Sequence, residues 1–293
     1  MRMLRPAPGI LAFYDGRIPG RRIYSSAPNW IDGGAYELGI ASYAVVAGDE
    51  ALVYDTHTSL PHARWVRQVL EAAGVRRMRV VLSHWHLDHV AGNQAFADSE
   101  IIAHARTDEL LREHRAAIEA GAQSGPPAID PLVRPTTVYD GVLRLWLGGI
   151  PVELRHVDVH SEDGTILVLP ESGLLLAGDA LEDPITYVAE PVRLESHLAD
   201  LRRMADWNVA RILPNHGDAS RIEAGGYGPG LIEATIRYIE RLLRSRMDPA
   251  LRALDLREFV AEELARGDIN YFAPYEAVHR RNLKMLLRSK PAT

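Results

Sequence analysis

The sequence predicts an α/β fold, a four-layer αββα sandwich, followed by a C-terminal helical appendage. Two successive halves of the chain each contain short β-rich runs interrupted by helical patterns, and the pattern changes to helices alone from residue 229 onward. Two such halves are typical of two sheets packed face to face with helices outside. An apolar content of 47% and a charged content of 25% are those of an ordinary globular protein.

The first half begins with a predicted hairpin, in which residues 41–47 and 51–55 are β-rich and Gly48 lies in the turn between them. Residues 61–73 place apolar side chains at helical spacing and end at Gly74, which is typical of a helix and its C-terminal cap. The next predicted elements are a strand at 78–82, a helix that begins directly after 89, a strand at 100–103, a helix at 107–120 and a loop at 121–135. The proline-rich loop is expected to overhang a cleft.

The second half repeats this alternation of strands, turns and helices. Residues 147–149, Leu-Gly-Gly, and residues 162–164, Glu-Asp-Gly, have the composition of turns. Strands are predicted at 142–147, 151–156, 165–169, 174–177 and 210–213, and a helix at 195–205.

After the glycine-rich segment 225–230 the sequence becomes helical. An apolar stripe at helical spacing indicates the first helix of the tail, at Ile232, Ile236, Ile239 and Leu243. Two further helices are predicted at 254–265 and 274–287. We therefore expect two domains, residues 1–228 and residues 229–293.

Composition and charge exclude several classes of protein. The chain has no cysteine, so it can form neither disulfides nor thiolate–metal bonds, and any metal must be bound by His, Asp or Glu. The apolar runs are too short to cross a bilayer and no signal segment is evident, which predicts a cytoplasmic protein without a membrane partner. Residues 1–228 contain 21 Lys+Arg against 30 Asp+Glu, so a nucleic-acid partner is not expected. The expected partner is a small-molecule substrate, and assembly into a homo-oligomer is an alternative that the sequence leaves open.

The stretch SHWHLDHVAGN, residues 83–93, follows a predicted strand and holds four metal-competent side chains. Residues two apart in an extended segment point the same way, so His84 and His86 can converge on one ion. Asp88 and His89 come one helical turn later and can reach a second ion close by. A single catalytic zinc ion keeps about three protein ligands. Four candidates in one loop therefore indicate either two ions or three ligands with a base.

Three further metal-competent residues each follow a predicted strand. They are His160 in HVDVHSEDGT, Asp179 in LLLAGDALEDP and His216 in ILPNHGD. Groups at strand ends gather along one sheet edge, so we expect all seven side chains to line a single cleft.

The motif His-x-His-x-Asp-His, with a later His, a Gly-Asp and a Pro-x-His-Gly in that order, resembles the metallo-β-lactamase superfamily of αββα hydrolases. The likeness covers roughly residues 36–220, including the first hairpin, whose final Asp55 is usually a structural acid in this family. It implies a dinuclear centre of the glyoxalase II or lactonase type, with two zinc ions expected and iron or manganese as alternatives. It implies that His84, His86 and His160 bind metal 1, that Asp88, His89 and His216 bind metal 2, and that Asp179 bridges them.

The sequence departs from this family at two points. His57 stands where family members often have glycine after Asp-Thr, and His160 lies in Val-His-Ser rather than the common Gly-His-Thr. His156 is therefore a rival for the role of His160.

Several other side chains are candidates for roles near the metals. His57 is a candidate to hold a ligand by a hydrogen bond, and His279 is a candidate to reach the cleft, although a helix-surface position is expected. Tyr187 is a candidate catalytic residue that donates a hydrogen bond to a substrate oxygen, with packing of its ring as the alternative. Trp85 is expected to turn into the protein. Ordinary packing or surface roles are expected for His62, His104, His114 and His197.

The predicted function is hydrolysis of an ester, thioester, lactone or amide-like bond by a hydroxide held between two metals. Asp88 is expected to bind metal 2 and to take up or orient the proton of the water. Three other functions stay open. The first is an oxygenase of the persulfide-dioxygenase kind, in which one iron ion is bound by His84, by His86 or His160, and by Asp179. The second is a phosphodiesterase or ribonuclease, and the third is a binding protein with structural metals.

Overall fold

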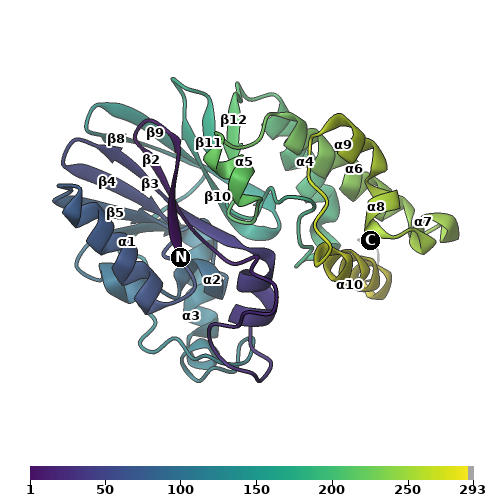
Figure 1. Ribbon diagram of the computed structural model, residues 1–293, viewed down its shortest axis with the longest axis horizontal. Coiled ribbons are helices and arrows are strands. Elements are labelled where there is room, and N and C mark those ends of the chain that lie inside the picture. The colour runs from purple at the N-terminus through teal and green to yellow at the C-terminus, as the bar shows by residue number, and fades with distance from the viewer. Residues whose placement is uncertain (290–293) are drawn as a thin grey trace.

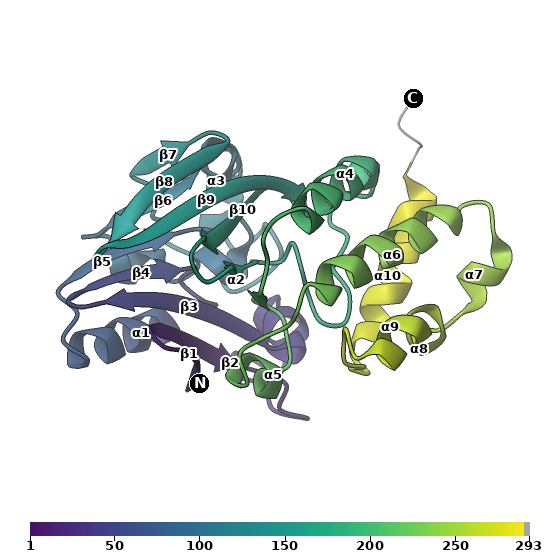
Figure 2. The ribbon, with the colours of Figure 1, turned by 90° about the horizontal axis from the view of Figure 1, so that it is seen from above.

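The computed structural model describes residues 1–289, in which two β-sheets pack against each other (Figure 1, Figure 2). The first sheet contains, in spatial order, β1 (Arg2–Ala7), β2 (Ile10–Asp15), β3 (Ile40–Ala47), β4 (Glu50–Tyr54), β5 (Arg77–Val81), β6 (Glu100–His104) and β7 (Thr137–Tyr139). The second contains, in spatial order, β12 (Arg211–Leu213), β11 (Leu174–Leu176), β10 (Ser161–Leu169), β9 (Ile150–Val159) and β8 (Val142–Leu147).

Parallel strand pairs bring the segments that carry the predicted site to one edge of each sheet. In the first sheet β4 and β5 are parallel, and in the second β11 and β12 are parallel. Parallel strands end at the same edge of a sheet. The residues that follow β4 and β5, Asp55 and His84, therefore lie near each other, as do Asp179 and His216, which follow β11 and β12.

The side chains of the central strands alternate between two apolar layers. In β4, Leu52 and Tyr54 belong to the core between the sheets, whereas Ala51 and Val53 belong to the layer beneath the outer helices of the first sheet. Residues two apart in a strand point to the same face. A strand covered on both faces is apolar throughout, which is why β4 appears in the sequence as a continuous apolar run.

Helices form the two outer layers. Apolar side chains of α1 (Leu60–Ala72) and α3 (Ala105–Glu119) pack outside the first sheet, and α4 (Leu194–Ala205) packs on β9 of the second. The shorter helical elements before residue 229 are η1 (Ile31–Tyr36), α2 (Leu87–Val90), η2 (Asn93–Phe96), η3 (Pro191–Arg193) and α5 (Ala219–Glu223). The predicted α/β sandwich with four layers and a helical C-terminal region is confirmed.

The C-terminal region consists of helices beside the second sheet (Figure 2). They are α6 (Gly230–Arg244), α7 (Pro249–Ala253), α8 (Leu256–Phe259), α9 (Ala261–Arg266) and α10 (Tyr275–Arg288). Ile232, Ile236 and Ile239 of α6 are buried, as the apolar stripe predicts, and α6 packs against α4. The domain boundary at residue 228 stays a prediction. No helix in residues 1–289 has the length and apolarity that a membrane span needs.

The predicted helix at 254–265 is wrong, because the structure divides this segment into α8 and α9. Leu254 is extended, and Asp255 begins α8 with a capping box that also uses Glu258. A capping box satisfies the free N–H groups at the start of a helix, so it stabilises a new helix at this position. Val260, with φ −118°, then separates α8 from α9.

Two other differences concern strands. β1, β2 and β7 lie outside the elements that the sequence predicts. The predicted turn at 162–164 is wrong, because these residues belong to β10 and the chain instead reverses at His160, whose φ is +68°. Asp163 is fully buried and accepts hydrogen bonds, so its carboxylate is internal to the protein rather than exposed in a turn.

Helix α10 is fixed to the segment 182–188 by buried polar contacts. The amide of Asn282 accepts a hydrogen bond from the N–H of Val188 (2.9 Å) and donates to the carbonyl of Thr186 (3.0 Å). Tyr275 donates its hydroxyl proton to Glu182 (2.9 Å). These bonds attach the C-terminal helix to a segment of the αββα sandwich.

We expect Asn282→Ala to lower the free energy of unfolding by about 2–4 kcal/mol, because it leaves the N–H of Val188 and the carbonyl of Thr186 buried without partners. Chemical denaturation measures the change. Lys284→Ala, at an exposed position on the same helix, is the control and should keep wild-type stability. Equal stability of the two variants would contradict this account of how α10 is held.

Candidate metal site

All seven predicted metal-competent side chains meet at one end of the sandwich. The loop after β5 carries His84 and His86, and α2 carries Asp88 and His89. The other three come from the turn between β9 and β10, from the end of β11 and from the end of β12; they are His160, Asp179 and His216. Their ligand atoms fall into two groups, within each of which all atoms lie within 4.8 Å of one another.

The first group contains His84, His86 and His160. The Nε2 of His160 lies 3.0 Å from the Nδ1 of His86. The ring of His84 is centred 4.5 Å from that of His86 and 5.0 Å from that of His160. Three imidazoles thus surround one point.

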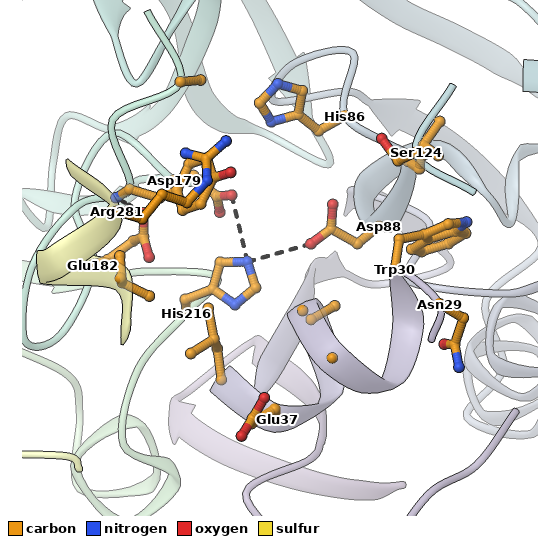
Figure 3. A pocket seen from close by; sticks show the side chains of 18 of the residues that line it. Asn29, Trp30, Glu37, His86, Asp88, Ser124, Asp179, Glu182, His216 and Arg281 are labelled. Atoms are coloured by element: carbon orange, nitrogen blue, oxygen red, sulfur yellow. Dashed lines mark hydrogen bonds and ion pairs between the residues drawn. The ribbon is translucent and has the colours of Figure 1, made fainter. Parts of the chain in front are cut away.

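The second group contains Asp88, His89, Asp179 and His216. The Oδ2 of Asp88 lies 3.3 Å from the Nε2 of His216 and 3.6 Å from the Nε2 of His89. Figure 3 shows His216 between the two carboxylates. This group presents two imidazoles and two carboxylates.

Asp179, a member of the second group, also lies close to the first. Its Oδ2 lies 3.1 Å from the Nε2 of His89 and 3.4 Å from that of His216. The same oxygen lies 3.7 Å from the Nε2 atoms of His84 and His160 in the first group. A single carboxylate oxygen is therefore the nearest common neighbour of imidazoles from both sheets.

Backbone carbonyls orient two of these imidazoles. His160 donates its Nδ1 proton to the carbonyl of Tyr187 (2.8 Å), and His216 donates its Nδ1 proton to the carbonyl of Gly39 (2.7 Å). A hydrogen bond at Nδ1 fixes both the ring orientation and the tautomer. Each ring then presents the lone pair of Nε2 to the centre of the site when it is neutral.

The buried carboxylate of Asp55 supports the site from below. It accepts a hydrogen bond from the backbone N–H of Ser83 (2.6 Å) and another from the amide of Asn215 (2.6 Å). Its Oδ2 also lies 2.9 Å from the Nδ1 of His89. The hydroxyl of Ser83 is 2.9 Å from the Nδ1 of His84. Asp55 therefore links the ends of β4, β5 and β12.

Burial keeps the first group neutral. It lowers the pKa of His86 to about 4 and that of His160 to about 3, and it lowers the pKa of His84 well below its usual value. Neutral imidazole is the form that binds a metal. These three rings are therefore available as ligands at pH 7.

The second group behaves in the opposite way. Burial lowers the pKa of His89, but the carboxylates of Asp179 and Asp88 outweigh burial and raise that pKa well above its usual value. The pKa of His216 is raised for the same reason. Burial raises the pKa of Asp88, but His89 and His216 outweigh it and lower the pKa to about 2. Carboxylates and protonated imidazoles thus balance one another here without a metal.

The donor atoms fit divalent cations. The Nε2 of His84 and the Oδ1 of Asp179 are buried and have no hydrogen-bond partner among residues 1–289. Buried polar atoms are almost always paired, so unpaired ones indicate a missing partner. Imidazole nitrogens with carboxylate oxygens suit zinc, iron or manganese.

A cavity of about 800 Å³ opens beside these groups, and Asp88, His86 and His216 line it (Figure 3). The loop after α3 contributes Gln123, and α10 contributes Arg281, so both segments expected to shape the cleft lie along it. Residues of the segment 28–38 form a further wall, which the sequence did not predict.

Two expectations about side chains near the cleft are wrong. His57 does not hold a ligand imidazole, because its ring stacks on His62 (4.5 Å) and its Nδ1 accepts the N–H of Thr58. His279 lies neither in the cleft nor on a helix surface, because it is buried against Tyr238 and Phe259.

The rival histidine and the two aromatic candidates occupy distinct places. His156 lies outside both groups and stacks on His104, with 4.0 Å between ring centres. Trp85 is partly buried, as expected: it packs against the apolar layer outside the first sheet and stacks on His114 (4.6 Å), and it also lines the cavity. Tyr187 also lines the cavity.

Sequence reasoning missed three supporting residues. Asn215 supports Asp55, Asp163 accepts the N–H of Trp85 (2.9 Å), and the buried Glu182 accepts the N–H of Tyr187 (2.7 Å). Each is close in sequence to a predicted ligand. That adjacency is a usable signal, because groups that orient ligands are often on the same loop.

Curated relatives are similar to this chain at modest identity. Lactamase-like protein ptaB of Pestalotiopsis fici is 24% identical over 80% of each chain. Atrochrysone carboxyl ACP thioesterase dmxR1 of Cryptosporiopsis sp. is 26% identical over 61% of this chain and 49% of the relative. Thioesterase pkgB of Emericella nidulans is 28% identical over 74% of this chain and 55% of the relative. The matched part thus spans about half the length of the latter two.

Solved structures share the fold. A metallo-beta-lactamase from Pontibacter korlensis superposes with a TM-score of 0.61 at 14% identity, covering 82% of this chain and 98% of that chain. The DIM-1 metallo-beta-lactamase superposes with a TM-score of 0.59 at 18% identity, covering 82% and 96%. The family model described as the metallo-beta-lactamase superfamily matches residues 35–216. Because that match covers more than half of the chain, the protein belongs to the metallo-beta-lactamase superfamily and is a hydrolase of that superfamily.

Proposed function

We propose that this protein is a dinuclear metal-dependent hydrolase that cleaves an ester, thioester, lactone or amide-like bond of a small molecule. One observation carries the proposal. The Oδ2 of Asp179 lies 3.1–3.7 Å from imidazole nitrogens of both ligand groups. A carboxylate in this position is suited to bridging two cations.

The proposed ligand sets follow the two groups. Metal 1 is assigned to His84, His86 and His160, metal 2 to Asp88, His89 and His216, and Asp179 to both. Zinc is the proposed metal, and iron or manganese also suits these donors. When bound, two such ions lower the pKa of a shared water and polarise the bond to be cleaved.

The chain supplies the proton acceptor and the rigid frame. The carboxylate of Asp88 lines the cavity and keeps 19% of its side-chain surface exposed, so it is placed to accept or orient the proton of a water. Asp55 and the carbonyls of Gly39 and Tyr187 hold the imidazoles in fixed orientations. Tyr187 itself is proposed to donate a hydrogen bond to a substrate oxygen.

Within the classes of bond considered, a thioester is favoured by two relatives. Their names describe an atrochrysone carboxyl ACP thioesterase and a thioesterase, and the two matches cover 61% and 74% of this chain. We therefore propose acyl thioesters as the first substrates to assay.

The number of metals is tested with two histidine variants. Zinc-loaded wild-type protein should contain two zinc ions per chain by elemental analysis, and chelation should abolish thioester hydrolysis. His160→Ala should contain no more than one ion, because a ligand of metal 1 is lost, whereas His156→Ala, which removes the rival histidine, should contain two. One iron ion per chain with oxygen consumption would instead support an oxygenase.

Metal binding should release protons mainly from the second group. His89 and His216 are protonated at pH 7 in the metal-free protein because their pKa values are raised, whereas the first group is neutral. The affinity for metal 2 should therefore fall as the pH falls from 8 to 6, whereas that for metal 1 should change only as the pH approaches about 4, the pKa of His86. Calorimetry in buffers of different ionisation enthalpy measures the released protons. Equal release by both zinc equivalents would be inconsistent with this assignment.

The role of Asp88 is tested by Asp88→Asn. The variant should keep the fold by circular dichroism, but turnover should fall about 100- to 10,000-fold because the proton acceptor is lost. Asp206→Asn, at an exposed position after α4, is the control with unchanged turnover. Near-normal turnover of Asp88→Asn would refute the proposed role.

A further inference from the structure

More acidic than basic side chains line the cavity. Its lining residues include the acidic side chains of Glu37, Asp88, Asp179 and Glu182 but a single Lys or Arg, Arg281. Asp88 and Asp179 belong to the metal groups, and both oxygens of Glu182 accept hydrogen bonds from the protein. Within residues 1–289, Arg281 is therefore the one Lys or Arg side chain that lines this cavity and can offer a fixed positive charge to a ligand.

Aromatic stacking and α10 fix the position of Arg281. Its guanidinium carbon lies 4.0 Å from the centre of the Tyr187 ring. One terminal nitrogen donates to the carbonyl of Val188 (3.5 Å), and no carboxylate among residues 1–289 pairs with it. A stacked guanidinium keeps its in-plane N–H groups free, and Arg has five of them. Asn282, the next residue, anchors this turn of the helix.

Arg281 is close to the candidate metal site. The ring of Tyr187, on which the guanidinium lies, is centred 6.0 Å from the ring of His160. One aromatic ring thus separates the free cation from a proposed ligand of metal 1. These two separations bound the distance from the guanidinium to the His160 ring, and a short acyl chain whose carbonyl carbon lies at the metals is proposed to span it.

We infer that Arg281 binds a carboxylate on the acyl part of the substrate, so that the preferred substrates are thioesters or esters of dicarboxylic acids. The planar guanidinium matches a carboxylate with two parallel hydrogen bonds. This inference rests on the proposed hydrolytic function and adds the class of acyl group.

A phosphate on the leaving group is the other oxyanion that Arg281 can recognise. In an acyl-phosphopantetheine thioester, however, the phosphate lies at the far end of the pantetheine arm from the thioester carbonyl. Because only the Tyr187 ring lies between Arg281 and His160, we assign Arg281 to a carboxylate on the acyl side rather than to this distant phosphate.

The kinetic test compares two thioesters of N-acetylcysteamine with five-carbon acyl groups, glutaryl and valeryl, which differ by a terminal carboxylate. The zinc-loaded wild-type protein should prefer glutaryl by roughly 10- to 100-fold in kcat/KM, mainly through KM, which is the expected size of a charge-assisted bidentate contact. Arg281→Met should lose this preference. Arg280→Met, which changes the exposed neighbouring arginine of α10, should keep it. An Arg281→Met variant that still prefers glutaryl would overturn the inference.

A binding test separates this inference from the hydrolytic function. In non-hydrolysable ketone analogues, a methylene group replaces the thioester sulfur. The glutaryl analogue should bind wild-type protein and Arg280→Met about 10-fold more tightly than the valeryl analogue by calorimetry, and Arg281→Met should bind both equally. This pattern without hydrolysis of either thioester would refute the hydrolytic function alone. Equal or absent binding of both analogues to wild-type protein would overturn the role of Arg281.

A third comparison covers the phosphate. Valeryl-phosphopantetheine and valeryl-pantetheine should be hydrolysed with similar kcat/KM by wild-type protein. A preference for the phosphorylated substrate that disappears in Arg281→Met would place this arginine at the leaving group and overturn the carboxylate assignment.

Discussion

The buried carboxylate of Asp179 is the constraint on which the site depends. A buried charge is costly unless positive groups and hydrogen bonds surround it. Here four imidazoles lie within 3.7 Å of one oxygen, and they come from segments distant in sequence. In the metal-free protein, protonated His89 and His216 provide the compensating charge. The same arrangement of donor atoms would suit cations in place of those protons.

The two sheets stabilise this close packing of charged and polar groups, because the supporting residues lie at strand ends rather than on free loops. Asp55 follows β4, Ser83 follows β5 and Asn215 follows β12, and they are joined by hydrogen bonds of 2.6 Å. Parallel pairing fixes the relative positions of these ends. A ligand set held by rigid elements and by supporting hydrogen bonds keeps its geometry, which is the condition for efficient use of bound metals.

The C-terminal helices connect the choice of substrate to the metal groups. Asn282 holds the segment that contains Tyr187, and the carbonyl of Tyr187 orients His160. The same helix presents Arg281 to the cavity. One segment, residues 182–188, therefore contacts a proposed metal ligand on one side and the cavity wall on the other. Changes in α10 should therefore alter substrate preference, while the hydrogen bonds among Asp55, Ser83 and Asn215 at the strand ends stay intact.

The sequence by itself determined the layers and the seven candidate ligands, because short apolar strands, the closely spaced group His84 to His89 and single metal-competent residues just after predicted strands are local patterns. It did not determine the turn at His160, the division into α8 and α9, the wall at residues 28–38 or the burial of His279. Those features depend on contacts between distant segments, such as α10 against residues 182–188. A polar run like Glu-Asp-Gly at 162–164 has the composition of a turn. Only the tertiary structure decided that Asp163 is buried, because the N–H of Trp85 and the hydroxyl of Ser161 satisfy its carboxylate there.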